Sequence, residues 1–422
     1  VLMNPFFVII LAAIVLDFVL NLVANLLNLR ALKFEPPTGL EDVYNSDEYR
    51  RSQQYTRTNT RFECVTDAFG LVVILSFWLW GGFNYLDQIV RSWGFIAIVN
   101  GLLYIGTLLM AHGLLMLPLS VYATFGIEQR FGFNRTAPRT FILDRLKGVG
   151  LALLLGAPVL ASVLALFEYI RAYAWLYCWI VVTVFSLAVQ FVAPTWIMPL
   201  FNKFTPMKPG ELRDSIVDYC RRTKFPVRDV FVMDSSKRST KSGAFFTGFG
   251  RNKRIALFDT LVQKHSTPEL VAVLGHEIAH YRKKHILQGM IIGILHTGIV
   301  FFLLSIFVDS LGLYQAFFME QPSIYAGLLF FGLLYTPVEM LLSIALKMLS
   351  RRNEYQADRF ATETIEEPKN FINALKKLSS DNLTNLTPHP LYVVLNYSHP
   401  PLWQRVHAIQ KHAAELATNS GP

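Results

Sequence analysis

Residues 270–309 read LVAVLGHEIAHYRKKHILQGMIIGILHTGIVFFLLSIFVD, and two patterns meet in them. The first is an HExxH motif, which runs from His276 through Glu277 to His280. The second is the apolar run 286–309, which exceeds the about 20 residues that a bilayer-spanning helix needs. A candidate metal-binding helix therefore runs almost directly into a candidate membrane span.

The composition of the whole chain agrees with a membrane protein. Of its 422 residues, 53% are hydrophobic and 16% are charged. An average soluble domain has about 45–50% apolar and about 25% charged residues. These values argue against a soluble cytosolic enzyme and exclude a disordered chain.

Seven apolar segments have the length of a spanning helix. They lie at roughly 5–29, 66–86, 94–122, 149–168, 173–201, 286–309 and 323–348. The third segment is either one long tilted helix or two short ones. We therefore expect a multi-pass α-helical membrane protein.

The basic residues indicate how the spans are oriented. Six Lys and Arg lie in 30–65, five in 123–148, 17 in 202–285 and eight from Ser350 onward. The opposite side carries only Arg91 and Arg171 in its loops. Because cytoplasmic loops carry the excess of Lys and Arg, we predict an N-terminus that is lumenal or outside and large cytoplasmic segments. The net charge of +9 then follows membrane topology and gives no reason to expect nucleic-acid binding.

The first span carries polar residues on one helical face, at Asp17, Asn21, Asn25 and Asn28. The last span carries Glu339. Polar groups are costly in hydrocarbon, so they either bond to other helices or line a water-filled interior. The sequence leaves both alternatives open.

The HExxH motif predicts a zinc site. Before it, Thr267 is expected as the N-cap, Pro268 at the first helical position and Glu269 as an acid in the first turn. On a helix, His276 and His280 project from the same face, and two imidazoles so placed can bind one Zn²⁺. Glu277 lies beside them and is placed to take a proton from a metal-bound water.

The third ligand is expected from a later helix. A metzincin would continue with a glycine and a third histidine, but Lys283 and Ile286 occupy those positions. Glu354 and Asp358 follow the last span at helical spacing. Glu354 can complete a His₂Glu site, and Asp358 can orient a ligating histidine from behind. The alternative for such a pair is a solvated acidic face.

At this point the chain resembles the type I CAAX prenyl proteases, which are seven-span zinc metallopeptidases. The resemblance rests on the HExxH, two later spans and then SRRNEYQAD at 350–358. Further similar segments, in the same order, are 49–55, 127–134, 199–206, 253–261 and 397–402.

The resemblance implies a fold in which seven transmembrane helices enclose a chamber, with a cytoplasmic α+β zinc protease domain of the gluzincin type. We divide the chain into helices 1–5 (1–201), a first protease segment (202–285), helices 6 and 7 (286–349) and a second protease segment (350–422). The resemblance also implies one Zn²⁺ per chain on His276, His280 and Glu354, with Glu277 as the general base.

The resemblance gives His399 and Arg405 a role over the site, as stabilisers of the oxyanion. A tetrahedral intermediate does need hydrogen-bond donors besides the metal. The alternatives are a loop histidine before a Pro-Pro turn and a cation on a helix surface.

Residues 243–249 and 254–258 are expected to form a hairpin around a turn at 250–253. Ser242, Gly243, Ala244 and Phe245 match the family's edge strand, which receives substrate by β-augmentation. The family commonly has His-Ser-Asn-Ala-Tyr where this chain has Lys241-Ser242-Gly243-Ala244-Phe245. The departure puts substrate preference in question but leaves backbone pairing intact.

The resemblance therefore predicts a membrane zinc endopeptidase that cleaves prenylated proteins at a C-terminal CaaX. The membrane would be that of the endoplasmic reticulum and inner nucleus in a eukaryote, or the inner membrane in a bacterium. One alternative is a quality-control protease that cuts membrane proteins without a prenyl requirement. A second is a transporter with a structural metal, but an open ligand position beside Glu277 argues against it.

Overall fold

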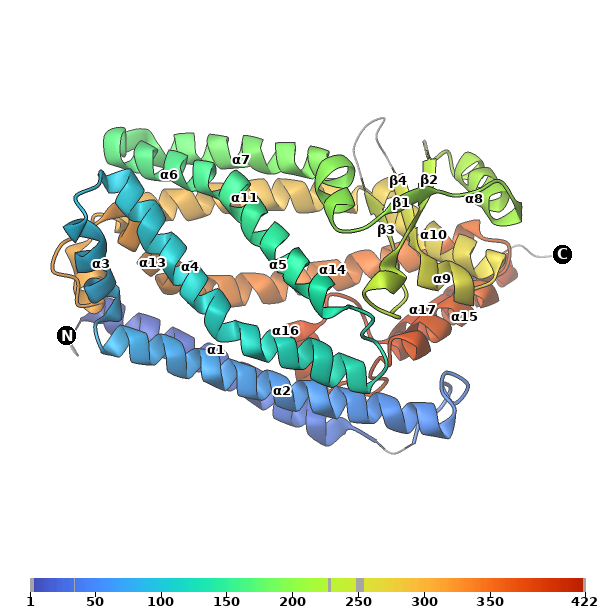
Figure 1. Cartoon of the computed structure of the whole chain (residues 1–422). Coiled ribbons are helices and arrows are strands. Elements are labelled where there is room, and N and C mark those ends of the chain that lie inside the picture. Colours follow the sequence, from blue (N-terminus) through green and yellow to red (C-terminus); the bar gives the residue numbers. More distant parts are fainter. Residues whose placement is uncertain (1–3, 34, 227–228, 248–253, 420–422) are drawn as a thin grey trace.

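The computed structural model describes residues 4–33, 35–226, 229–247 and 254–419. The molecule is elongated, with long helices along most of its length and a small sheet with short helices at one end (Figure 1).

All seven predicted spans fall on helices. Six helical stretches are long and apolar enough to cross a membrane, and one bent pair makes a seventh. Their bounds are α1 (Pro5–Ala31), α2 (Ser46–Leu79), α4 with its π-helical continuation (Ala97–Glu128), α5 to α6 (Pro138–Tyr169), α7 with its flanking turns (Arg171–Leu200), α11 (His285–Phe307) and the pair α13 and α14 (Ile324–Leu334 and Thr336–Thr364). The third span is therefore one long helix. The pair bends by 53° at Tyr335, two residues before Pro337. A proline cannot donate a backbone hydrogen bond, and its ring clashes with the carbonyl four residues earlier, so a continuous helix is interrupted there.

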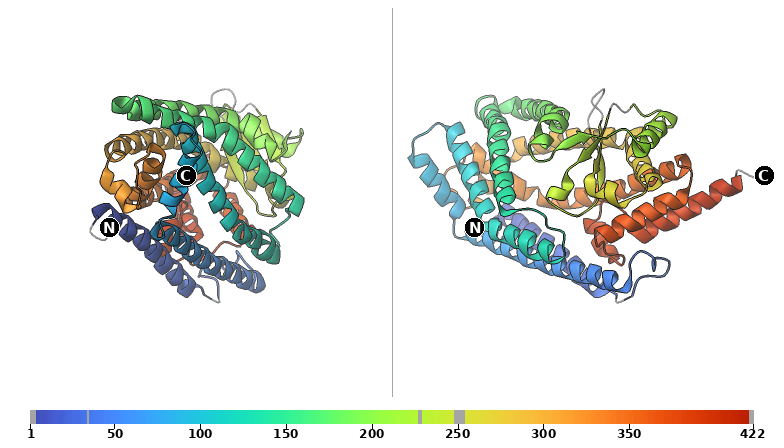
Figure 2. Two further views of the ribbon diagram at one scale, coloured as in Figure 1. Left: turned by 60° about the vertical axis from the view of Figure 1, so that its left-hand side comes forward. Right: turned by 45° about the vertical axis from the view of Figure 1, so that its right-hand side comes forward.

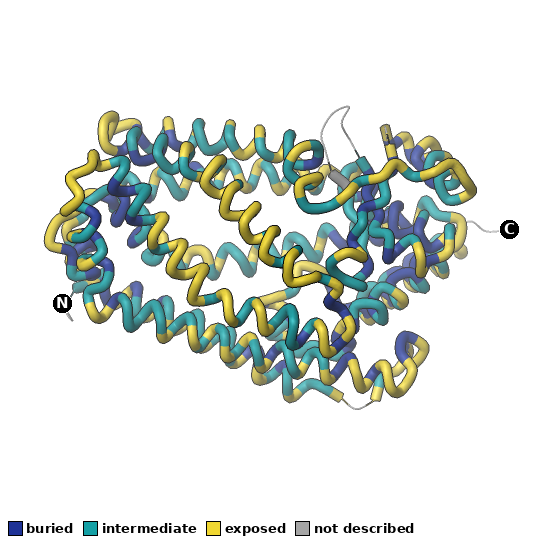
Figure 3. The backbone as a smooth tube through the Cα atoms, viewed as in Figure 1, coloured by how far each residue is buried: buried dark blue, intermediate teal, exposed yellow. Residues whose placement is uncertain are grey.

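Helices α4 and α5 run across the molecule with little burial, as the exposed stretches of Figure 3 show. Within α5 (Pro138–Leu151) no residue is buried, and α4 (Ala97–Val121) buries only Asn100, Gly101 and Tyr104. A helix packed on a solid core would bury a continuous stripe. These helices therefore border open space on more than one face, in agreement with a hollow arrangement of spans.

An aromatic cluster joins the spans at the end far from the sheet. Trp78 stacks on Phe317, and its indole N–H donates to the Ala316 carbonyl at 2.8 Å. Phe317 also stacks on Phe330 of α13. Two short helices, α3 (Gly82–Ser92) and α12 (Leu311–Ala316), complete this end.

The sheet has the order β1-β2-β4-β3 and mixed direction. Its strands are β1 (Phe204–Pro206), β2 (Asp229–Met233), β3 (Ala244–Thr247) and β4 (Arg254–Phe258). The predicted hairpin is confirmed as the antiparallel pair β3 and β4, while its turn lies outside the described residues. β3 is an edge strand, because no other described strand pairs with its far side.

The remaining helices come from both predicted protease segments; most lie at the end of the molecule that holds the sheet (Figure 2), whereas α16 packs on α1 and α14. They are α8 (Glu211–Arg222), α9 (Asp259–Lys264), α10 (Thr267–Arg282), α15 (Pro368–Asp381), α16 (Pro390–Asn396) and α17 (Leu402–Asn419). One hydrophobic cluster contains Leu257 and Leu274 from the first segment, with Phe360 and Leu378 from the second packed against it. The two segments therefore fold around a common core, although two spans separate them in sequence.

Candidate metal centre

The HExxH motif lies on α10, whose start is fixed by local chemistry. Ser266 is the N-cap, one residue before the position that the sequence suggested, and its backbone N–H donates to the Glu269 carboxylate at 2.9 Å. Further along, a Cβ at Gly275 would lie 3.6 Å from the Ala361 backbone and against the Tyr219 hydroxyl. The glycine therefore allows α10 to pack closely on α14, the helix that carries Glu354.

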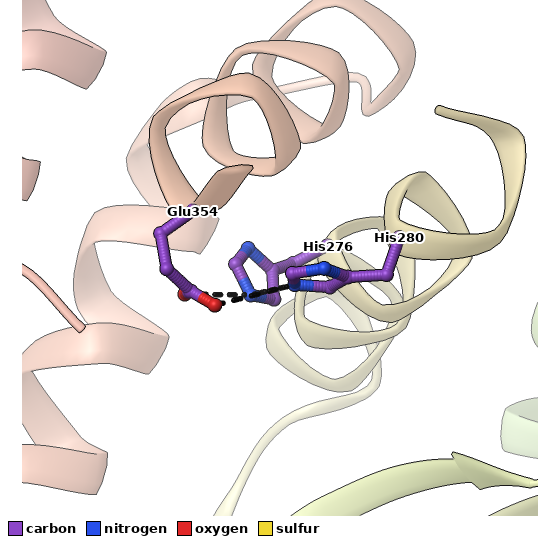
Figure 4. A group of neighbouring side chains, drawn as sticks. All are labelled: His276, His280 and Glu354. Carbon is purple, nitrogen blue, oxygen red and sulfur yellow. Dashed lines mark hydrogen bonds and ion pairs between the residues drawn. The ribbon is translucent and has the colours of Figure 1, made fainter. Parts of the chain in front are cut away.

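His276, His280 and Glu354 converge from these two helices (Figure 4). The two Nε2 atoms lie 3.2 Å apart, and Glu354 places one carboxylate oxygen 3.3 Å from His276 and the other 3.4 Å from His280. One ligand atom from each residue falls within 4.8 Å of the others. Among the described residues, none gives Glu354 Oε2 an aligned hydrogen bond, although this atom is buried.

These donors fit a small divalent cation. Two imidazole nitrogens and a carboxylate are the ligand set of an open zinc site, which leaves a fourth position for water or substrate. Burial and, to a smaller extent, the neighbouring His276 lower the pKa of His280 to about 4, so that His280 is neutral at pH 7. Burial also opposes protonation of His276, but hydrogen bonds to Asp358 and Glu354 outweigh it and raise the pKa to about 9. A cation would take the place of that proton.

Asp358 and Arg405 form a charged pair next to His276, on the side away from the other two candidate ligands. The Nδ1 atom of His276 lies 2.9 Å from Asp358. Arg405 donates to the same carboxylate from Nε at 2.8 Å and from a terminal nitrogen at 2.6 Å. Arg405 also lies 3.4 Å from His276 Nδ1 and 4.0 Å from Glu354. The guanidinium group of Arg405 therefore forms its two short hydrogen bonds with the Asp358 carboxylate.

His285 and Gln356 form a second supporting pair, next to His280. The sequence did not predict this pair. His285 Nδ1 lies 3.2 Å from His280 Nδ1, and His285 Nε2 lies 3.2 Å from the Gln356 side-chain oxygen. Lys284 has a positive φ of 63°, which turns the chain between α10 and α11 so that His285 meets His280. The signal available in the sequence was a third histidine five residues after the second.

Two further predicted residues lie at the open side of the triad. Glu277 and His280 together line a cavity that runs toward α11. His399 Nε2 lies 3.4 Å from Glu354, its side chain is 61% exposed, and its Nδ1 lies 2.9 Å from the Ser398 hydroxyl. Partial desolvation outweighs the nearby Glu354 carboxylate and lowers the pKa of His399 below its ordinary value.

The edge-strand residues do not all offer free backbone. Ser242 donates its N–H to Asn382 at 3.1 Å and accepts from the Asn382 amide at 3.2 Å. Gly243 accepts from the Phe258 N–H at 3.1 Å, and Phe245 stands opposite Ala256 in β4. Because bonded positions alternate in an antiparallel pair, Ala244 and Phe246 direct their N–H and C=O groups to the open edge. Of the four predicted residues, Ser242 and Ala244 therefore direct backbone groups outward, and those of Ser242 are bonded to Asn382.

Comparisons with known proteins agree along most of the chain. Residues 25–203 match the CAAX prenyl protease N-terminal family with five membrane helices, and 206–413 match peptidase family M48. The chain is 34% identical over 400 residues to CAAX prenyl protease 1 of Saccharomyces cerevisiae, covering 88% of each chain. It is 30% identical to the Homo sapiens homologue over 420 residues, covering 89% of this chain and 88% of that one. The crystal structure of S. mikatae Ste24p superposes with a TM-score of 0.91 at 32% identity, covering 96% of this chain and 99% of that one.

Proposed function

The chain belongs to the CAAX prenyl proteases of peptidase family M48, and from this premise we propose that it hydrolyses a peptide bond in the C-terminal CaaX segment of prenylated proteins. It is a multi-pass membrane metalloendopeptidase. Family membership favours this activity over a transporter with a structural metal.

The metal in this proposal is zinc, held by His276, His280 and Glu354. When bound, zinc polarises the scissile carbonyl and lowers the pKa of its water. Two imidazoles and one carboxylate favour zinc over calcium or magnesium, which prefer oxygen ligands.

Glu277 is assigned the proton transfer. It follows a ligand directly on α10 and lines the cavity that borders His280, so its carboxylate faces the space where substrate must lie. It accepts a proton from the attacking water and returns it to the leaving amine. General acid–base catalysis of this kind contributes about 10²–10⁴-fold to the rate.

His399 and Arg405 take different roles. If the Ser398 hydroxyl donates to His399 Nδ1, the Nε2–H of the neutral ring points to the triad and can donate to the developing oxyanion. Arg405 touches Asp358 with both ends of its fork, so we assign it to positioning His276 through that carboxylate.

The substrate main chain is assigned to the open edge of β3. α10 lies beside this strand, so a peptide paired with Ala244 and Phe246 runs past the metal centre (Figure 1). Backbone pairing tolerates Gly243 in place of the family's asparagine. A side chain there would press on Phe258, because a Cβ would lie 3.2 Å from its ring.

The convergence of His276, His280 and Glu354 beside Glu277 carries the proposal, and a peptide assay tests it. The purified protein in detergent is expected to cleave a farnesylated CaaX peptide faster than its unprenylated twin. Glu277→Gln and a zinc chelator should each abolish cleavage. A Glu277→Gln variant as active as wild type would refute the assignment. Equal cleavage of both peptides would favour a quality-control protease instead.

We also propose that the protease segments face the cytoplasm, because the loops beside them hold nearly all the Lys and Arg. A single-cysteine variant at exposed Lys237, in a background with the native cysteines replaced, should react with an impermeant maleimide only from the cytoplasmic side of sealed membranes. Reaction from the opposite side would reverse the orientation.

A further inference from the structure

A cavity of about 490 Å³ extends from the metal centre along the space between α11 and α14. Glu277 and His280 line it at the metal end, and His296 lines it farther along α11. From His285 to His296 the helix rises by roughly 16 Å, at about 1.5 Å per residue. The cavity is therefore continuous with the reaction centre and long in one direction.

Glycines keep this cavity open on the α11 side. Gly289 and Gly293 lie one turn apart in its lining, and a Cβ added to either would meet no atom within 4 Å. Ile286 and Ile292 flank them, and Leu346 and Leu349 line the α14 side. A ligand between the two helices would therefore contact mainly aliphatic carbon and glycine backbone.

The polar side chains in the lining bond mostly to protein groups. Asn353 donates to Gln288 at 2.9 Å, which joins α14 to α11. His285 is held between His280 and Gln356, as described above. At the far end, His296 lies 3.4 Å from Glu339 and 3.3 Å from the Tyr335 hydroxyl. With these groups occupied, an apolar ligand would leave few polar groups without partners.

We propose that this cavity binds the isoprenoid chain of the substrate while the peptide lies along β3. The inference rests on the proposed function and names the part of the protein that recognises the prenyl group. The prenylated cysteine must lie at the metal centre for the adjoining bond to be cut, and the cavity starts there. Its length along α11 is comparable to that of an extended farnesyl chain.

Chain-length selectivity tests the proposal. We would compare wild type, Gly289→Leu and Gly293→Leu on peptides that carry S-farnesyl, the shorter S-geranyl or no prenyl group. Gly106→Leu is the matched control, because Gly106 is an exposed glycine of α4 whose Cβ would also meet open space. Metal content and cleavage of the unprenylated peptide report whether each variant is folded.

Gly293→Leu, deeper in the cavity, should raise KM for the farnesylated peptide by about tenfold or more, because a whole isoprene unit loses its apolar contact. It should leave KM for the geranylated peptide nearly unchanged. Gly289→Leu, one turn nearer the metal, should raise KM for both. Neither should alter cleavage of the unprenylated peptide or metal content.

Farnesyl kinetics identical to wild type in both glycine variants would overturn the cavity assignment and leave the proposed protease intact. Failure of wild type to cut any CaaX peptide would instead overturn the proposed function. If the leucine variants lose metal, the wild-type protein is instead photo-crosslinked with a peptide whose cysteine carries a photoactivatable farnesyl group, and the labelled segments are identified. Labelling within 286–296 or 346–353 supports the proposal, and labelling confined to other segments refutes it.

Discussion

Each of the two histidines at the metal centre is held by a residue behind it, and the two supports differ in chemistry. His276 contacts the anionic Asp358, whose charge Arg405 neutralises. His280 contacts the imidazole of His285, which in turn contacts the side-chain amide of Gln356. Both supports fix which ring nitrogen carries the proton and leave Nε2 facing the metal position. The charge of the two supports together is therefore close to neutral.

Replacing Arg405 separates positioning from direct oxyanion stabilisation. Arg405→Gln leaves Asp358 buried without its charged partner, so we expect His276 to lose its orientation and zinc affinity to fall by about 10–100-fold. Competition with a chromogenic chelator measures the affinity. If kcat falls while zinc affinity stays at the wild-type value, Arg405 acts on the oxyanion and the positioning role is wrong.

Replacing His285 tests the other support. The Gln356 side-chain oxygen can only accept, so His285 donates to it from Nε2, and a neutral His285 then accepts at Nδ1 from the Nδ1–H of His280. His285→Ala removes the acceptor and should also lower zinc affinity by about 10–100-fold. His285→Asn restores an acceptor and should recover much of that affinity. Equal affinity of the alanine variant and wild type, by the same chelator competition, would contradict the role.

At the scale of elements, β3 offers a peptide only its alternate residues. Ala244→Pro removes one outward N–H, and proline is tolerated where an edge strand faces away from its partner. We expect kcat/KM to fall about tenfold, since a lost hydrogen bond of about 1.5 kcal/mol is worth that factor. Ala244→Val, which keeps the N–H, is the matched control. Zinc affinity should be unchanged in both, and equal peptidase activity of the two variants would count against pairing at this edge.

The start of α10 predicts a pH-dependent contribution to stability. Burial raises the pKa of Glu269, but Lys377 at 2.8 Å and the Ser266 N–H outweigh it and hold the pKa below its ordinary value of 4.5. A lowered folded pKa gives stability that is complete above about pH 4.5 and is lost as pH falls through the folded pKa. The difference in melting temperature between wild type and Glu269→Gln should therefore be constant near neutral pH and shrink below pH 4.5. A difference in melting temperature that does not change with pH would show that the charge of the Glu269 carboxylate does not stabilise the fold.

The sequence predicted the elements whose signals are local. Span length follows from apolar runs, and the HExxH histidines follow from helical spacing. Glu354 lies 74 positions beyond His280 and was found because a helix pattern and a family resemblance coincided there. The Ser242–Asn382 and His285–Gln356 pairs could not be predicted, because their partners are 140 and 71 residues apart and meet only through tertiary packing.

At the scale of the whole molecule, the segment before β3 joins the sheet to the membrane helices. Lys241 bonds to Tyr55 of α2 at 2.8 Å and to Glu128, at the end of the third span, at 2.9 Å. Its ammonium also lies 4.6 Å from the centre of the Phe133 ring. Arg238 pairs with Asp144 of α5 at 2.8 and 3.0 Å. The position of β3, the proposed substrate edge, is thus set by membrane helices as well as by the sheet.

Lys241→Met therefore should affect activity through the position of β3 and not through the metal. It keeps an apolar side chain of similar length but leaves Glu128 and Tyr55 without their cation, a cost of about 1–3 kcal/mol. We expect faster hydrogen exchange in residues 239–247, a lower kcat/KM and unchanged zinc affinity. Lys237→Met, at an exposed position in the same segment, is the control and should change none of these. Hydrogen exchange followed by mass spectrometry compares the two directly, and equal exchange in both would mean that the Lys241 contacts do not hold the strand in place.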